Sequence, residues 1–387
     1  MTGPNALLPG RRRAVTLRGR PELYTEYAAD QALLNTPAKR RFAAVLLLVL
    51  VVVPFFLDRD INGLLTRVFI TSIGAIGLNL VTGYAGQVSL GHAFFLGLGA
   101  FTAAFLGSEP SGSLRGLGLE MWAWLPLSGL VAAVVGALVA PLAARVRGLY
   151  LAILTLGLVF VGDHLFKEMR TFTVGQGIGR RAAAPIVGGL DLYRRQTILG
   201  VEVEGDVLFY FVCLLLLLGL GVAARNLARS KTGRSFAAVR DRDIAAEVMG
   251  VPLVRTKVLA FTISSFYAGV CGALLAVTFG TIVPENFGLL LSVDFLAMIL
   301  IGGVATISGS IVGAAFVVLL PRLVQSLTDV LPFISRGGSS QGLFSVDQLQ
   351  GMLFGALIVG FLVLEPRGLY GLWLRIRNYW KAWPFSY

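Results

Sequence analysis

Residues 207–224 read VLFYFVCLLLLLGLGVAA, an apolar run without a charged residue. Runs of this kind, of roughly 16 to 24 residues, recur from Phe42 to Leu364, and each is near the length of a helix that crosses a hydrocarbon core of about 30 Å. A transmembrane barrel would instead show segments of about 10 residues with alternating polarity. The sequence therefore predicts an all-α, polytopic helical membrane protein.

We expect about ten transmembrane helices, with boundaries uncertain by several residues. The predicted spans are 42–57, 67–84, 88–107, 122–144, 149–166, 207–224, 257–280, 288–303, 306–325 and 349–364. With both termini in the cytoplasm, 22 of the 33 basic residues face inward, as the charge bias of cytoplasmic loops requires. The same topology explains the net charge of +12, so we expect no nucleic-acid partner.

Three regions follow from this topology. Residues 1–41 are predicted to be a basic cytoplasmic tail that lies on anionic lipid, and residues 367–387 a cytoplasmic C-terminal tail. Residues 42–366 form the transmembrane domain, with an external segment at 167–206 and a cytoplasmic loop at 225–257. The first span is expected to remain as an anchor, because Pro54, Phe55 and Phe56 replace the small residues of a signal-peptide cleavage site.

Two Gly-rich stretches interrupt the apolar pattern. They are Gly83–Gly91 (GYAGQVSLG) and Gly302–Gly309 (GGVATISG), and we expect both to be breaks between half-helices that face the bundle interior or a pathway. Close packing through small residues is a compatible alternative. Polar residues in or near the breaks are candidates for the substrate pathway: Gln87, Ser89, Thr155, Thr306 and Ser308. Each could instead bond to a neighbouring helix, or, for Thr155, to its own backbone.

The cytoplasmic loop has the pattern of a folded segment. Apolar residues from Ala237 to Val248 form a helical stripe with charges between them, and Gly250 and Pro252 supply a stop signal. The pattern predicts a short amphipathic helix that offers a contact surface to a cytoplasmic partner. A basic helix that lies on lipid is the alternative.

Several motifs in one order resemble a known family. They include Gly77–Ala100 (GLNLVTGYAGQVSLGHAFFLGLGA), Arg147–Gly157 (RGLYLAILTLG), Thr173–Gly179 (TVGQGIG) and Glu365–Leu369 (EPRGL). The chain resembles the LivM-like permease subunits of ABC importers for branched-chain amino acids, from about residue 67 to residue 370. The resemblance implies a bacterial inner-membrane heterodimer with a second, related permease, together with two cytoplasmic ABC ATPases and an extracytoplasmic solute-binding protein. It also implies that ATP and Mg are bound by the partner subunits and that this chain binds no cofactor.

The resemblance implies one contact surface, and the Gly-rich form of the external loop suggests a second. In that family the cytoplasmic loop carries a coupling helix that sits on the ATPase, with a Glu-Ala-Ala motif followed by Gly; here Ile244 replaces the Glu. We expect ATPase coupling through Arg240, Asp241, Arg242, Asp243, Ala245, Ala246, Glu247 and Gly250. The external loop is expected to dock the binding protein, unless it is only a flexible turn, through Thr173, Gly175, Gly177, Arg180 and Arg181.

Three classes of function can be weighed from the residues. The chain has no phosphate-binding loop of the form G-x-x-x-x-G-K-[ST], so we expect a pore-forming subunit, not an enzyme, driven by ATP hydrolysed elsewhere. A stand-alone secondary transporter or channel would need intramembrane ionisable residues, for which Asp294 alone is thin support. A membrane enzyme would need clustered His, Asp or Glu, and we find no such cluster; metal ligands are not expected either, since Cys213 and Cys271 lie in apolar runs.

The substrate is less constrained. Similar permeases serve branched-chain amino acids, other amino acids, or urea and short amides, and selectivity resides largely in the binding protein. In the second break, Ala305 stands where we regard Gly as usual, so we expect a stiffer backbone at that position.

Overall fold

Apolar helices make up most of the computed structural model, which describes residues 37–110, 116–146, 148–169, 179–193, 196–198, 201–328, 334–335, 344–365 and 367–382. Residues 48–373 form one compact unit, and the described residues before Leu48 and after Trp373 belong to a second. The helices are α2 (Pro37–Val52), α3 (Arg59–Asn79), α4 (His92–Gly107), α5 (Met121–Arg145), α6 (Leu149–Glu168), α8 (Gly205–Arg229), α9 (Lys231–Asp241), α10 (Asp243–Val248), α11 (Leu253–Phe279), α12 (Leu289–Gly302), α13 (Ile307–Thr328), α14 (Val346–Leu364) and α15 (Gly368–Ala382).

Short elements complete the fold. Two 3-10 turns occupy η1 (Val53–Phe55) and η3 (Pro284–Phe287), and a π-helical turn, η2 (Leu80–Tyr84), prolongs α3. Antiparallel pairs join β1 (Arg180–Arg181) to β6 (Thr281–Ile282), β2 (Ile186–Val187) to β3 (Leu190–Asp191), and β4 (Gln196–Ile198) to β5 (Val201–Val203). A parallel pair joins β7 (Ile334–Ser335) to β8 (Phe344–Ser345).

The structure confirms a polytopic helical membrane protein. Each predicted span overlaps a helix, and six stretches among the described residues are long and apolar enough to cross a membrane: Arg59–Tyr84, Met121–Arg145, Leu149–Glu168, Gly205–Arg229, Leu253–Phe279 and Pro284–Gly302. The exact number of crossings remains a prediction. The span predicted at 67–84 begins at Arg59, because polar residues continue the helix; Asn62 is buried there and donates from Nδ2 to the carbonyl of Pro54 at 2.9 Å.

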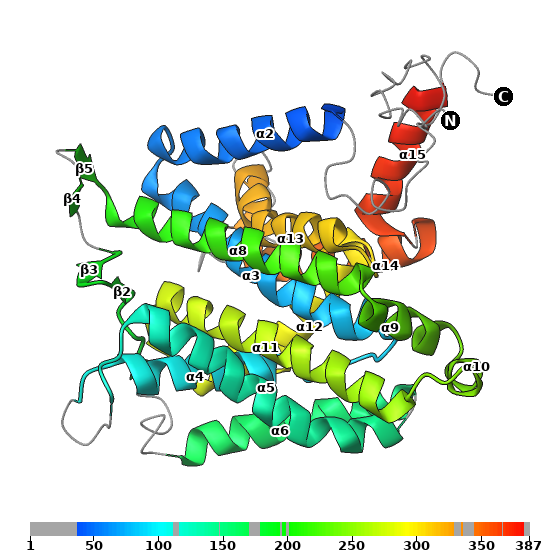
Figure 1. The fold of residues 1–387 in the computed structure, drawn as a ribbon. Helices are drawn as coiled ribbons and strands as arrows, with labels where there is room; N and C mark the ends of the chain where they lie inside the picture. The colour runs from blue at the N-terminus through cyan, green and yellow to red at the C-terminus, as the bar shows by residue number, and fades with distance from the viewer. Residues whose placement is uncertain are drawn as a thin grey trace, which may run out of the picture. The chain divides into compact units, whose positions relative to one another are not determined.

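The bundle of residues 48–373 is built around α3 and α11. These two helices are mostly buried, whereas α5, α6 and α8 expose apolar side chains such as Leu138 and Leu215, as lipid-facing helices do. Figure 1 shows α11 beside α3, with α8 on one side of the pair and α4, α5 and α6 on the other.

Glycine allows α4 and α11 to cross closely. A Cβ added to Gly99 would overlap the backbone of Gly269, and one added to Gly272 would overlap the backbone of Leu96. In lipid, the hydrophobic effect does not drive helices together, because the lipid tails are as apolar as the side chains. Helices associate instead through close packing, which small residues such as glycine allow. These glycines lie outside the two predicted breaks and serve close helix packing.

Candidate functional site

Both predicted breaks interrupt helices. The first lies between the π-helical end of α3 at Tyr84 and the start of α4 at His92, and the second lies between Gly302 of α12 and Ile307 of α13. Helix ends leave backbone groups without intrahelical partners, so buried breaks need side chains that satisfy them.

Asn79 joins α3 to the second break. Its side chain is buried and donates from Nδ2 to the carbonyl oxygen of Thr306 at 2.9 Å and to Oγ of Ser310 at 2.7 Å, while Oδ1 accepts from the backbone N–H of Ala305 at 2.8 Å. The amide thus pairs the backbone N–H of Ala305 within the break and adds a second donor to the carbonyl of Thr306, which also accepts from the backbone N–H of Ser310 at 3.1 Å. Sequence analysis missed Asn79, although a lone Asn inside the GLNL apolar run was a usable signal.

The two breaks touch each other at Gly83. A Cβ added to Gly83 would overlap Oδ1 of Asn79 and lie 2.5 Å from the backbone nitrogen of Ala305. Only glycine lets these two stretches of backbone approach so closely.

Ala305 holds a strained backbone conformation. Its φ is +59°, and among the described residues it is the one non-glycine with a positive φ. Such a conformation costs an alanine about 1 kcal/mol or more, and the bond from its N–H to Asn79 helps to hold it in place. Ala305, where we expected a stiffer backbone, therefore has a φ that glycine would adopt without strain.

Arg240, near the end of α9, reaches the first break. Its Nη1 donates to the carbonyl oxygen of Gly83 at 3.1 Å, and it also pairs with the exposed carboxylate of Asp241 at 2.9 Å. Gly86, with a φ of +69°, leaves room for this side chain, since a Cβ added there would lie 2.8 Å from Cγ of Arg240. The loop predicted to be cytoplasmic is thereby attached directly to the interrupted end of α3.

The predicted cytoplasmic loop, residues 225–257, contains two short helices, α9 and α10, and not the single amphipathic helix predicted. The chain becomes extended at Arg242, with φ −156° and ψ 103°, and this separates α9 from α10. Ser230 caps α9 by accepting from the N–H of Gly233 at 3.4 Å. Asp243 sits in the first turn of α10, and Gly250 follows that helix with a φ of +84°.

An exposed apolar surface surrounds α10. Ile244, Val248 and Met249 are 66%, 82% and 84% exposed, whereas Ala246 is buried; Ala245 and Glu247 are exposed between them. We call Ile244, Val248 and Met249 the α10 apolar surface. Contiguous exposed apolar side chains mark interaction sites, and sequence analysis had emphasised the charged residues instead.

The pathway candidates differ in their free hydrogen-bonding capacity. Gln87 is buried, and neither atom of its side-chain amide has a partner within the described part of the chain. The hydroxyl of Thr155 donates to its own helix and also accepts from the N–H of Leu90 at 2.9 Å, so it fixes the first break. Ser89 is buried and accepts from the N–H of Gly91 at 3.3 Å, while Thr306 donates to the carbonyl of Gly303 at 2.8 Å.

Ser308 stands apart from these four residues. It is exposed in the first turn of α13, whereas Gln87, Ser89 and Thr155 are buried. The structure thus brings the two breaks together but places only part of the candidate set in the interior.

The external docking residues are divided in the same way. Thr173, Gly175 and Gly177 lie outside the described residues. Arg180 is 2% exposed, donates from Nη2 to Oγ of Ser108 at 3.0 Å and lies over the ring of Phe105, and burial lowers its pKa. The expectation that Arg180 presents its charge to a docked protein does not fit this burial, whereas Arg181 is exposed.

Comparisons with known proteins agree on one family. A family model described as the permease component of branched-chain amino acid transport systems matches residues 61–362. The chain is 31% identical over 347 residues to the high-affinity branched-chain amino acid transport system permease protein LivM of Salmonella typhimurium, covering 87% of this chain and 76% of that protein. It is 30% identical to LivM of Escherichia coli over 347 residues, which again cover 87% of this chain and 76% of that protein.

A more distant relative is a probable branched-chain amino acid transport permease protein LivH of Methanocaldococcus jannaschii. It is 26% identical over 276 residues, which cover 68% of this chain and 79% of that protein. No solved structure matches the chain.

Proposed function

Because the chain belongs to the family of permease components of branched-chain amino acid transport systems, we propose that it is a membrane subunit of an ATP-driven ABC importer. With a second, related permease it forms the pathway for branched-chain amino acids. The observation that carries the proposal is the bond from Arg240 to Gly83, because it joins a cytoplasmic loop to an interrupted transmembrane helix.

The driving force comes from partner subunits. The α10 apolar surface, with Ala245 and Glu247 beside it, seats on a cytoplasmic ATPase, and ATP and Mg are bound there and not by this chain. The exposure of Ile244, Val248 and Met249 supports this contact, because burying their apolar surface against a partner would stabilise the complex by about 25 cal/mol per Å².

Movement of the ATPase reaches the pathway through two side chains. When the loop shifts, Arg240 pulls on the carbonyl of Gly83 at the end of α3, and Asn79 passes the shift to Thr306 and Ala305 in the second break. The two breaks therefore move as one gate. Such coupling needs a contiguous physical link with two arrangements, and the helix breaks supply it.

Gln87 is the residue of this gate that is best suited to meet substrate. Its amide has two donors and an acceptor, all available among the described contacts, and a zwitterion offers partners of both kinds. Outside the membrane, exposed Arg181 contributes to the docking of the solute-binding protein. Both termini lie in the cytoplasm under this proposal.

Reconstitution tests the function. The chain is purified with its partner subunits and placed in vesicles, and accumulation of radiolabelled leucine is followed with and without ATP. We expect uphill accumulation of leucine that requires ATP. Excess isoleucine or valine should suppress this accumulation, whereas urea should not. Accumulation by the chain alone without ATP would contradict the proposal, and suppression by urea alone would refute the substrate.

A further inference from the structure

A cavity of about 360 Å³ with charged and apolar walls lies at the end of α3 that is farthest from Arg240. Arg59, Asp60 and Arg67 of α3 line it together with Asp206 and Phe209 of α8 and with Tyr193, which precedes α8. The last residue of α3 that lines the cavity is Arg67, 16 positions before Gly83, so about 24 Å of helix separates the cavity from the first break. Under the proposed topology the cavity opens at the outer face of the membrane.

The charges of the cavity balance. Two guanidinium groups face two carboxylates, and Arg59 pairs with Asp206, which attaches α3 to α8. Asp60 and Arg67 remain, one of each sign, and neither forms an ion pair within the described part of the chain. A ligand with net charge would leave one of these groups opposed, whereas a ligand with both charges satisfies both.

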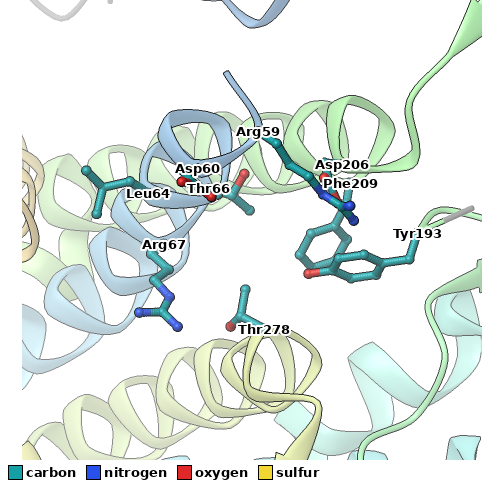
Figure 2. Close-up of a pocket in the computed structure, with 10 residues that line it drawn as sticks. Arg59, Asp60, Leu64, Thr66, Arg67, Tyr193, Asp206, Phe209 and Thr278 are labelled. Carbon is teal, nitrogen blue, oxygen red and sulfur yellow. Dashed lines mark hydrogen bonds and ion pairs between the residues drawn. The ribbon is translucent and has the colours of Figure 1, made fainter. Parts of the chain in front are cut away.

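The cavity also offers a hydroxyl donor beside the free guanidinium. Figure 2 shows Arg67 and Tyr193 on opposite sides of the same space, with Thr278 of α11 between them. The ring of Tyr193 packs on Phe209 at 5.2 Å between centroids, and burial raises the pKa of Tyr193 to about 12. Its hydroxyl therefore keeps its proton at neutral pH and can donate to an oxyanion.

The spacing of the free charges suits a short molecule. Asp60 and Arg67 are seven positions apart on one helix, about 10 Å along its axis, and both line the cavity. Leu64 and Phe209 supply apolar walls between them.

We propose that this cavity binds a small zwitterion, with its oxyanion held by Arg67 and Tyr193 and its ammonium group held by Asp60. Two sources carry this chemistry: a free α-amino acid, which rests on the proposed function, and the headgroup of phosphatidylethanolamine. None of the residues that line this cavity belongs to the two helix breaks.

Binding is measured by saturation-transfer NMR on the protein with its partner ATPase and permease subunits, without the solute-binding protein and without ATP. The nanodiscs consist of phosphatidylglycerol, which has no ammonium group. The ligands are leucine, glycerophosphoethanolamine and inorganic phosphate. Saturable binding of leucine or of glycerophosphoethanolamine, but not of phosphate, is the expected result, and the responding ligand identifies the source.

Matched variants assign the signal to the cavity. Arg67→Gln and Asp60→Asn should each weaken zwitterion binding about tenfold, as loss of one charge-assisted bond does, and Arg67→Lys should restore part of it. Glu109→Gln removes an exposed charge outside the cavity and should leave binding unchanged. Absence of zwitterion binding, preference for phosphate, or unaltered binding in Arg67→Gln would overturn the inference.

Failure of this inference is separable from failure of the proposed function. ATP-dependent uptake with no binding at the cavity would refute only the zwitterion site. Binding at the cavity in a complex that never accumulates amino acid with ATP would refute the proposed function and leave the site in place.

Discussion

The guanidinium of Arg240 bonds to the carbonyl oxygen of Gly83, a residue 157 positions earlier in the chain. The carbonyl belongs to the π-helical turn that ends α3, where a backbone group is free to accept. The bond joins a surface loop to a buried helix. Asn79, one helical turn before Gly83, then carries the connection to the second break.

Gly83→Ala should destabilise the protein. The added methyl group would overlap Oδ1 of Asn79 and crowd the nitrogen of Ala305, and overpacking of this kind costs about 1 to 3 kcal/mol. The measurement is the thermal unfolding midpoint in detergent. The control is Gly157→Ala in α6, where a Cβ meets no atom within 4 Å, and an equal effect in both variants would contradict the close contact of the breaks.

Ala305→Gly should stabilise the protein by about 0.5 to 1 kcal/mol, because glycine adopts the φ of +59° without steric strain. Ala315→Gly, in the interior of α13, should instead lower stability by about 1 kcal/mol through loss of helix propensity. Denaturation midpoints of the two variants are compared with the parent protein. Destabilisation by Ala305→Gly would show that the backbone is not strained there.

Met249→Glu should abolish copurification of the ATPase while leaving the membrane bundle folded. The side chain is 84% exposed beside α10, so the substitution disturbs no internal packing but places a charge in the proposed contact. Leu117→Glu, on an exposed side chain outside the cytoplasmic loop, is the control. Retention of the ATPase by Met249→Glu would remove the α10 apolar surface from the interface.

Local patterns in the sequence predicted the elements of the site. The apolar runs predicted the helices, and the Gly-rich stretches predicted both breaks. Unpaired backbone groups are costly in lipid, so a change from apolar to small and polar residues indicates where a helix is interrupted. The folded cytoplasmic loop was also predicted, since charge and apolar periodicity are local properties. Its division at Arg242 was not, because no Pro or Gly marks that position.

Contacts between segments that are far apart in the chain could not be predicted from local sequence patterns. Asn79 and Thr306 are separated by 227 positions, and no periodicity reports which polar residue of an apolar run faces which break. Arg180 shows the same limit: its position beside Arg181 suggested a surface charge, whereas β1 pairs with β6 and buries its side chain. Burial of one of two adjacent arginines depends on tertiary packing.

The amount of ATP hydrolysed for each amino acid accumulated, measured in vesicles that contain the full complex, tests the coupling through Arg240 most directly. Arg240→Ala removes the bond to Gly83. Arg234→Ala removes an exposed arginine of the same helix that, among the described residues, bonds through its side chain only to the nearby carbonyl of Arg229. We predict that Arg240→Ala raises the ratio about tenfold, equivalent to about 1.4 kcal/mol of lost coupling, while Arg234→Ala keeps the parent ratio. An unchanged ratio in an assembled Arg240→Ala complex would contradict the claim that this bond drives the gate.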